Sequence, residues 1–250
     1  ACVAGVTSSR CVAELGGVDI LINNVGGSAG GASLLDSTDE DWAETFDLNL
    51  FHAVRATRAV LPYMRERGGG AVVIVSSISG WKPGPRAQYG SAKAAEIFLA
   101  GALALELAEY NVRVNAVAPG SIYFPGGGWE RFREENPEAF ARFEEREQPA
   151  GRLGAPEEVA DEVAFLVSQR ACWVNGAMIP IDGAQGRPAA FWPLSDKSEG
   201  HALPVSHSLS LKQRQRPVDI DLSAGDITGL VRRQKENDVR HFFGTGGALL

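Results

Sequence analysis

The sequence has few of the residues on which disulfide-rich or metal-bound proteins depend. Its three cysteines are scattered over 250 residues, a pattern typical of reduced thiols rather than of a disulfide framework or a metal site. Only one of the four histidines, His52, lies outside the last fifty residues, so a zinc site or a serine triad based on histidine has few candidate residues. We therefore expect no bound metal.

Positive charge and long apolar runs are also scarce. The net charge of −7 argues against nucleic acid or an anionic membrane as the main partner. No run approaches the roughly 18 apolar residues needed to cross a bilayer, and the N-terminus has no basic segment followed by an apolar one. We expect a cytoplasmic protein that binds neither nucleic acid nor membrane. The 44% hydrophobic content is enough for one substantial core and is ordinary for a globular enzyme domain.

The stretch from Ser76 to Lys93 contains the residues with the clearest chemistry. The β-branched run at 71–77 predicts a buried strand that ends in hydroxyls, and residues 88–93 predict the first turn of a helix. Tyr89 and Lys93 are four residues apart, so both side chains lie on one face of that helix. A cation beside a phenol stabilises the phenolate, which makes the pair a candidate site of proton transfer.

Further polar motifs follow other predicted strands. The run at 18–22 ends at Asn23-Asn24-Val25-Gly26-Gly27, and the run at 112–117 is closed by Ala118-Pro119-Gly120. In a parallel sheet, ligands bind at the carboxyl ends of the strands. Asn49 lies among apolar neighbours in a predicted helix from Thr38 to Gly68, and a buried amide there needs hydrogen-bond partners.

These motifs, in this order, resemble those of the short-chain dehydrogenase/reductase family. Asn23 to Gly26 resembles the family's Asn-Asn-Ala-Gly motif, Tyr89 with Lys93 its Tyr-x-x-x-Lys motif, and residues 113–120 its segment beside the nicotinamide. The resemblance covers about Val18 to Gly186. It implies an α/β fold with a doubly wound parallel sheet, Rossmann-like, and NAD or NADP as cofactor.

The resemblance also implies a role for each site residue. Tyr89 would exchange the proton, Lys93 would favour the phenolate and hold the nicotinamide ribose, Ser77 would orient the substrate oxygen, and Asn49 would complete the proton relay. The cofactor-binding residues would be Asn24, Gly26, Tyr89, Lys93, Pro119, Gly120 and Ile122. Ser77 is preferred to Ser76 because Ile78-Ser79-Gly80 follows it, although Ser76 would restore the family's usual spacing to Tyr89. From its neighbours alone, Asn49 could equally be a satisfied core amide.

Both ends of the chain depart from the family pattern. The family's opening strand and glycine-rich turn should precede Val18, and residues 1–17 are too short to hold two strand-helix units. We interpret residues 1–186 as an N-terminally truncated domain. Residues 187–250 are slightly basic and rich in interrupting Pro, Ser and Gly, which predicts a poorly ordered extension with a helix over 227–243.

The leading hypothesis is an oxidoreductase that interconverts a small secondary alcohol and its carbonyl. The resemblance implies a homodimer or homotetramer packed through the two long helices. One alternative is a truncated, non-catalytic remnant that dimerises or binds through those helices, and a second is an epimerase or dehydratase with the same Tyr-Lys pair. The aromatic segment at 124–148 is either a lid over the substrate or a helix whose aromatic side packs on the core.

Overall fold

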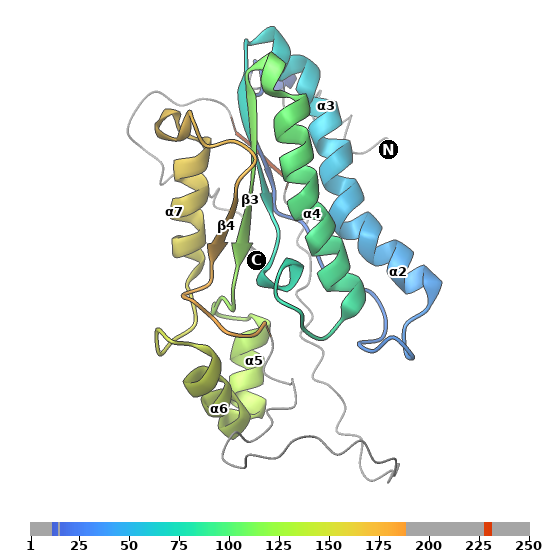
Figure 1. Ribbon diagram of the computed structural model, residues 1–250, viewed down its shortest axis with the longest axis vertical. Coiled ribbons are helices and arrows are strands. Elements are labelled where there is room, and N and C mark those ends of the chain that lie inside the picture. The colour runs from blue at the N-terminus through green and yellow to red at the C-terminus, as the bar shows by residue number, and fades with distance from the viewer. Residues whose placement is uncertain (1–11, 15, 189–227, 232–250) are drawn as a thin grey trace.

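A computed structural model describes residues 12–14, 16–188 and 228–231 (Figure 1). The strands are β1 (Ile20–Asn23), β2 (Gly70–Val75), β3 (Val112–Pro119), β4 (Met178–Ile181) and β5 (Thr228–Val231). The helices are α2 (Asp39–Phe46), α3 (His52–Glu66), α4 (Ala87–Glu106), α5 (Gly128–Glu135), α6 (Pro137–Glu147) and α7 (Pro156–Val167). The described part also contains the π-helix η1 (Asp47–Phe51) and the 3₁₀ turns η2 (Ile78–Gly80), η3 (Ala108–Tyr110) and η4 (Gln169–Ala171). Residues 12–14 are α-helical.

Four parallel strands form the sheet in the order β4-β3-β2-β1, and β5 pairs antiparallel with the outer edge of β1. The β-branched runs predicted from the sequence supply these strands because branched side chains pack well on a pleated surface. In register, Asn23 lies opposite Ile74, and Val75 lies opposite Val117. The carboxyl ends of β1, β2 and β3 therefore lie at one edge of the sheet. β3 extends two residues beyond its predicted end, to Pro119.

Helices cover both faces of the sheet, as predicted for a doubly wound α/β fold (Figure 1). Val72 and Ile74 point to the face covered by α3 and α4, where they join the largest apolar cluster. Val73, between them, points to the opposite face and packs with Leu166 of α7. Both alternating sets are buried, which explains why the strand reads as a continuous apolar run.

The predicted helix from Thr38 to Gly68 begins as expected but is not continuous. Thr38 is the N-cap of α2 and forms a capping box with Asp41. The Thr38 side chain accepts a hydrogen bond from the backbone N–H of Asp41, and the Asp41 side chain accepts one from the backbone N–H of Thr38. The π-helix η1 then separates α2 from α3 and has Asn49 at its centre. A π-turn widens the helix locally and commonly occurs at functional sites.

Helices α5 and α6 form a small aromatic unit between β3 and α7. The rings of Trp129 and Phe143 stack with 4.7 Å between centroids, and Phe132 and Phe140 pack edge-on or tilted beside them. With Leu153 these side chains form a separate buried cluster. The aromatic side of this segment thus packs into its own core, which agrees with the packing interpretation of residues 124–148.

The segment predicted as a helix over 227–243 is a strand where the structure describes it. Residues 228–231 form β5, so the helix prediction is wrong there, because the unpaired edge of β1 offers backbone hydrogen bonds that an isolated segment lacks. Residues 1–11, 15, 189–227 and 232–250 lie outside the described residues, and the proposed boundary after Gly186 stays a prediction. Within the described ranges, none of the helices is long and apolar enough to cross a membrane.

Candidate active site

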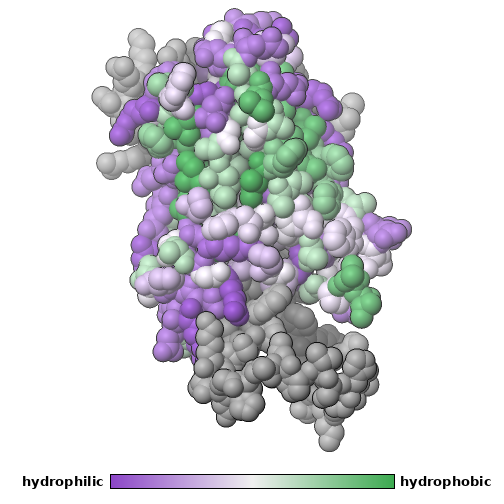
Figure 2. Space-filling model, in the orientation of Figure 1, coloured by the Kyte–Doolittle hydropathy of each residue, from purple (hydrophilic) through white to green (hydrophobic). Residues whose placement is uncertain are grey.

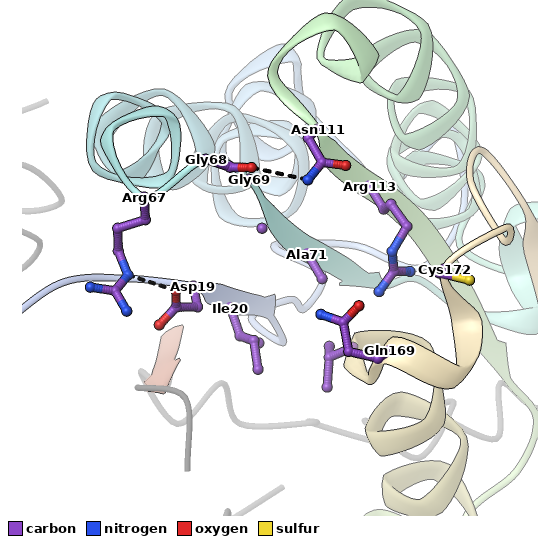
Figure 3. Close-up of a pocket in the computed structure, with 12 residues that line it drawn as sticks. Asp19, Ile20, Arg67, Gly68, Gly69, Ala71, Asn111, Arg113, Gln169 and Cys172 are labelled. Atoms are coloured by element: carbon purple, nitrogen blue, oxygen red, sulfur yellow. Dashed lines mark hydrogen bonds and ion pairs between the residues drawn. The ribbon is translucent and has the colours of Figure 1, made fainter. Parts of the chain in front are cut away.

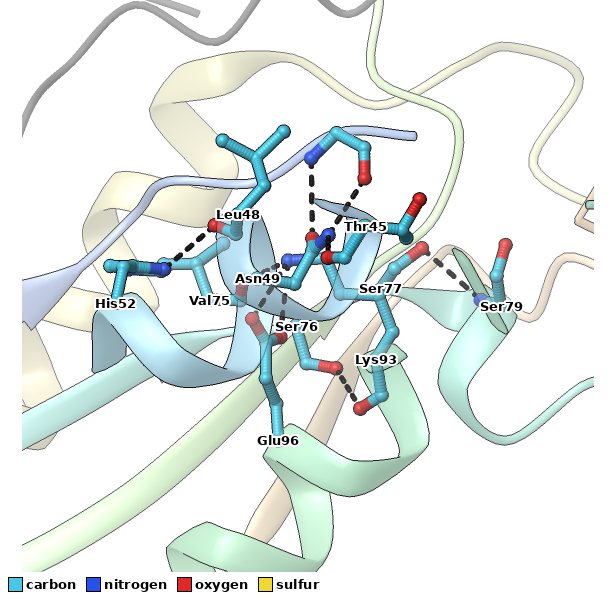
Figure 4. Close-up of polar contacts among 11 residues, drawn as sticks. Thr45, Leu48, Asn49, His52, Val75, Ser76, Ser77, Ser79, Lys93 and Glu96 are labelled. Carbon is cyan, nitrogen blue, oxygen red and sulfur yellow. Dashed lines mark hydrogen bonds and ion pairs between the residues drawn. The ribbon is translucent and has the colours of Figure 1, made fainter. Parts of the chain in front are cut away.

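The carboxyl-end edge of the sheet brings together residues from three separate motifs (Figure 4). Gly26 follows β1, Asn49 lies in η1, and Lys93 lies in α4. Ser76 and Ser77 follow β2 directly. The predicted strand ends thus form one cluster of polar groups, as expected for a binding edge.

Asn49 joins the π-helix to the loop after β1. Its side chain is fully buried, and its amide nitrogen donates to the carbonyls of Gly27, at 2.7 Å, and Thr45, at 2.6 Å. Its amide oxygen accepts a hydrogen bond from the Gly27 N–H at 3.2 Å. These bonds satisfy the amide, and they hold Gly27 against η1.

Gly26 is where the loop comes closest to the charged centre. A Cβ added at this position would lie 2.6 Å from Asn49 Oδ1 and 2.7 Å from Lys93 Nζ. Contacts below about 3 Å are incompatible with a methyl group. The motif Asn-Asn-Val-Gly therefore requires glycine at this position because any side chain would collide with Asn49 and Lys93.

Lys93 is almost fully buried, and its ammonium is paired. Nζ donates to the Val75 carbonyl at 3.0 Å and lies 3.3 Å and 3.1 Å from Oε1 and Oε2 of Glu96. Lys93 is 3% exposed and Glu96 is fully buried, so water screens this ion pair very little. Nζ also lies 5.8 Å from the centroid of the Tyr89 ring, which brings the predicted Tyr-Lys pair together.

The environment shifts both partners of the ion pair. Burial disfavours the Lys93 ammonium, but the negative charge of Glu96 and the proximity of Tyr89 outweigh it and raise the pKa of Lys93. Burial raises the pKa of Glu96, against the opposing effects of Lys93 and the Ser76 hydroxyl. Lys93 therefore stays an ammonium at neutral pH.

The two serines after β2, Ser76 and Ser77, form different hydrogen bonds. Ser76 is 5% exposed, and its hydroxyl donates to the carbonyl of Lys93 at 2.8 Å. Ser77 is less buried and accepts a hydrogen bond from the Ser79 N–H at 3.1 Å, which leaves its own proton available. The Ser76 proton anchors β2 to α4, whereas no hydrogen bond among the described residues uses the Ser77 proton.

The loop before Tyr89 is held at both ends. Arg86, the residue before α4, has a left-handed backbone with φ 62°, a conformation that a non-glycine residue adopts only when its surroundings impose it. Gln88 is buried and donates to the Gly31 carbonyl at 2.6 Å. Lys82, in the same loop, lies 2.8 Å from a carboxylate oxygen of Asp182. These contacts fix the position from which Tyr89 projects.

The end of β3 at Pro119 and the turn that follows it, with Gly120 and Ile122, are held in place by a residue that follows β4. Gln185 is fully buried. Its side-chain oxygen accepts a hydrogen bond from the Ser121 N–H at 2.7 Å, and its amide nitrogen donates to the Ser121 hydroxyl at 3.0 Å. Ile122 forms an isolated parallel bridge with Gly154. Because Lys82 also donates to the Gln185 carbonyl, this turn is tied to the loop that leads to Tyr89.

The two asparagines of the first motif separate in the structure. Asn23 is fully buried at the end of β1 and donates to the Thr57 hydroxyl of α3 at 3.4 Å. Asn24 is half-buried beside Gly26, and no hydrogen bond within the described ranges joins it to the cluster around Lys93. The prediction that Asn24 binds cofactor therefore rests on its place at the edge alone.

The cluster fits one half of a nicotinamide cofactor. The phenol of Tyr89, the Lys93 ammonium and the segment 119–122 lie at the carboxyl-end edge of the sheet. Gly26, which has no side chain, lets the loop after β1 pass close to Lys93 Nζ. The described part of the chain contains no glycine-rich strand-turn-helix of the kind that binds a pyrophosphate. The residues of the cluster could therefore hold the nicotinamide end of such a cofactor.

Several residues that hold this geometry were not predicted from the sequence, among them Thr45, Glu96 and Gln185. Glu96 did give a signal, because it is a single acidic residue within the apolar run of α4, three residues after Lys93. Thr45 and Gln185 gave none. The Thr45 hydroxyl accepts a hydrogen bond from the Ala29 N–H, and Gln185 bonds to Ser121, which lie 16 and 64 positions away in the chain.

A separate pocket of about 300 Å³ lies at the opposite edge of the sheet (Figure 3). Its cations are already paired: Arg67 lies 2.6 Å from Asp19, and Arg113 donates to the carbonyls of Leu166 and Ser168 at the end of α7. Burial lowers the pKa of Arg113. Because this pocket lies at the amino ends of β1 and β2, away from Tyr89 and Lys93, it is not part of the candidate active site.

Comparisons with known proteins agree with the geometry. A family model described as enoyl-(acyl carrier protein) reductase matches residues 6–184. A curated relative, dehydrogenase/reductase SDR family member 4 of Pongo abelii, is 40% identical over 172 residues. The match covers 67% of this chain and 59% of the relative, so the chain spans less than two thirds of that protein's length.

Two solved structures that resemble this chain contain a nicotinamide cofactor. The L-sorbose reductase of Gluconobacter frateurii, complexed with NADPH and L-sorbose, is 30% identical with a TM-score of 0.66, and the match covers 73% of this chain and 72% of that one. A 7α-hydroxysteroid dehydrogenase, complexed with NADH and 7-oxo glycochenodeoxycholic acid, is 31% identical with a TM-score of 0.67 and coverages of 75% and 71%. The α/β, Rossmann-like fold predicted from the sequence is thereby confirmed.

Proposed function

Since the chain belongs to the short-chain dehydrogenase/reductase family, whose members use NAD or NADP, we propose that it is an oxidoreductase that interconverts a small secondary alcohol and its carbonyl. The observation that carries this proposal is the buried Lys93 ammonium 5.8 Å from the Tyr89 ring, with Ser77 at the end of the neighbouring strand β2. An ammonium in that position favours the phenolate form of a tyrosine that must exchange a proton.

Each residue of the cluster has a task in the proposed reaction. Tyr89 takes the hydroxyl proton in oxidation and returns it to the oxygen in reduction. Ser77 donates a hydrogen bond to the same oxygen and so fixes its position relative to Tyr89. Lys93 stabilises the negative charge on the phenolate. Asn49 completes the proton relay, and its hydrogen bonds to Gly27 hold the loop so that the site keeps its shape.

The cofactor, when bound, accepts or donates the hydride at its nicotinamide ring. Pro119, Gly120 and Ile122 would flank that ring, Lys93 and Tyr89 would contact the adjoining ribose, and Asn24 and Gly26 would border the adenosine half. Whether NAD or NADP is preferred depends on residues outside this group.

A pair of serine variants tests the proposal and the choice of serine together. Wild-type protein supplied with NAD⁺ or NADP⁺ and a panel of secondary alcohols, or with the reduced cofactors and ketones, is expected to turn over. Ser77→Ala should lower kcat by about 100- to 1,000-fold, because it removes one donor to the reacting oxygen. The measurement is cofactor absorbance in steady-state assays.

Ser76→Ala is the matched control for the serine assignment. It removes the buried hydrogen bond to the Lys93 carbonyl, so we expect a loss of about 1 kcal/mol in stability with most of kcat retained. Full activity in Ser77→Ala would overturn the assignment.

The same assays distinguish the two alternative functions. Calorimetry that detects no binding of either cofactor, together with no turnover, would favour the non-catalytic binding module. Turnover without net redox change would favour an epimerase or dehydratase.

The apolar face of α4 supports the proposal that the chain forms a homodimer or homotetramer. Phe98 and Leu105 lie two turns apart on this helix and are 80% and 84% exposed. Gly101, between them, has open space above it. Figure 2 shows apolar side chains gathered over this part of the surface. An exposed apolar patch of this kind is typical of a protein–protein interface.

Replacing both large side chains should dissociate the assembly. For Phe98→Asp with Leu105→Asp, we expect light scattering after size exclusion to give the mass of a single chain, because two charges would be buried in the interface. Leu35→Asp, in a loop where Leu35 is 96% exposed, is the control and should keep the wild-type mass. A wild-type protein that is already monomeric at micromolar concentration contradicts the proposal. The cytoplasmic location stays a prediction.

A further inference from the structure

Helix α4 contains one buried carboxylate for which the proposed mechanism has no task. Glu96 is fully buried, and both of its carboxylate oxygens lie within 3.3 Å of Lys93 Nζ. An unpaired charge would be very unfavourable at this depth. A buried carboxylate at position 96 is therefore tolerated because the Lys93 ammonium pairs with it. Glu96 and the Val75 carbonyl in turn restrict where the Lys93 ammonium can lie.

The other polar groups that face the pair come from three elements. Tyr89 belongs to α4 itself, Ser76 follows β2, and His52 begins α3. Burial, reinforced by the charge of Lys93, lowers the pKa of His52 to about 4, so this ring is neutral in the physiological range. The charges that matter near the phenol are thus the ammonium of Lys93 and the carboxylate of Glu96.

We propose that Glu96 is a positioning residue that holds the Lys93 ammonium near Tyr89 and offsets part of its charge. The Lys93–Glu96 pair, rather than Lys93 alone, would then set the pH at which Tyr89 gains and loses its proton. The inference rests on the proposed function, because it assigns the tuning of that same site.

The sign of the effect follows from the charges. A lone ammonium stabilises the phenolate strongly, whereas an ammonium paired with a carboxylate has no net charge and stabilises it less. Removing the carboxylate therefore favours the phenolate and moves its formation to lower pH. Two unit charges a few ångströms apart in a protein interact strongly enough to give a shift on the order of one pH unit.

The test measures the ionisation of Tyr89 without cofactor or turnover. The tyrosinate absorbance of the full chain is followed against pH, and the Tyr89 transition is obtained by subtracting the curve of the same protein carrying Tyr89→Phe. In Glu96→Gln, which keeps the size of the side chain and removes its charge, we expect the midpoint to fall by about one pH unit. Glu96→Met removes the same charge with an apolar chain of similar length, so a folding failure of one variant leaves the other as the test.

Glu106→Gln is the control, since it neutralises an exposed glutamate of the same helix and should leave the midpoint unchanged. If Glu106→Gln moves the midpoint as far as Glu96→Gln, or if the folded neutral variants at position 96 leave it in place, the inference is wrong. Where the wild type turns over substrate, the pH profile of kcat/KM should move in the same direction. A midpoint shift in a protein that lacks turnover would support the role of Glu96 and contradict the proposed function. Failure of the inference about Glu96 can therefore be told apart from failure of the proposed function.

Discussion

Replacing Tyr89 by phenylalanine is expected to lower kcat by about 100- to 10,000-fold while the protein remains folded. General acid–base catalysis by a positioned side chain contributes about this much to a reaction rate, and phenylalanine removes the only atom of Tyr89 that can exchange a proton. The ring itself stays, so its packing near Lys93 is preserved. The measurement is steady-state turnover of the best alcohol or ketone in the panel, with circular dichroism to confirm the fold.

Tyr110→Phe is the matched control for this variant. Tyr110 lies in η3, beside the start of β3 and against Arg65, far along the chain from the cluster. Loss of its hydroxyl should leave kcat unchanged. A Tyr89→Phe variant that keeps near wild-type kcat would rule out Tyr89 as the proton-transfer residue.

Replacing Lys93 by methionine is expected to destabilise the fold by about 3–5 kcal/mol at neutral pH. This is the typical effect of removing one partner of a buried ion pair, and here it would leave the carboxylate of Glu96 buried without its cation. Chemical denaturation at pH 7 gives the change in the free energy of unfolding. Arg55→Met, which breaks the surface ion pair with Asp47, is the control and should have little effect.

The pH dependence of the Lys93→Met variant distinguishes the loss of charge from the loss of packing. Burial raises the pKa of Glu96. Without Lys93 only the hydrogen bond of the Ser76 hydroxyl opposes that shift, so the native state binds this proton more tightly than the unfolded chain does. Stability should therefore be greatest below the ordinary carboxyl value of 4.5 and should decline as pH rises above it. In the wild type, the raised pKa of Lys93 means that its contribution persists up to its ordinary value of 10.5 and is lost above it.

A second substitution should recover the stability that Lys93→Met loses. In the double variant with Glu96→Leu, both charges are gone and apolar side chains fill the site, a change that is often neutral or favourable for a buried ion pair. We expect its free energy of unfolding to return close to the wild-type value, without the pH dependence of the single variant. If the double variant is as unstable as Lys93→Met alone, the destabilisation comes from packing and the argument from charge fails.

The sequence by itself determined the fold class and the motifs. Continuous β-branched runs predicted β1, β2 and β3, and apolar residues at helical spacing predicted α3 and α4, because both patterns are local properties of the chain. The spacing of Tyr89 and Lys93 placed both on one face of a helix for the same reason. Local patterns failed at 227–243, where β5 forms a strand that pairs with the edge of β1.

The tertiary structure alone decided how the motifs combine and which groups hold them. Asn49 bonds to Gly27, and Gln185 bonds to Ser121, across 22 and 64 positions of sequence. The Ser76 hydroxyl donates to the Lys93 carbonyl of α4, a contact that the sequence does not record. Glu96 reads in the sequence as an acidic residue within the apolar part of a helix, and only its burial and its contact with Nζ make it the counter-charge of Lys93. The physical reason is common to all of these: hydrogen bonds and burial depend on distances in space, whereas periodicity records only which face of an element is buried.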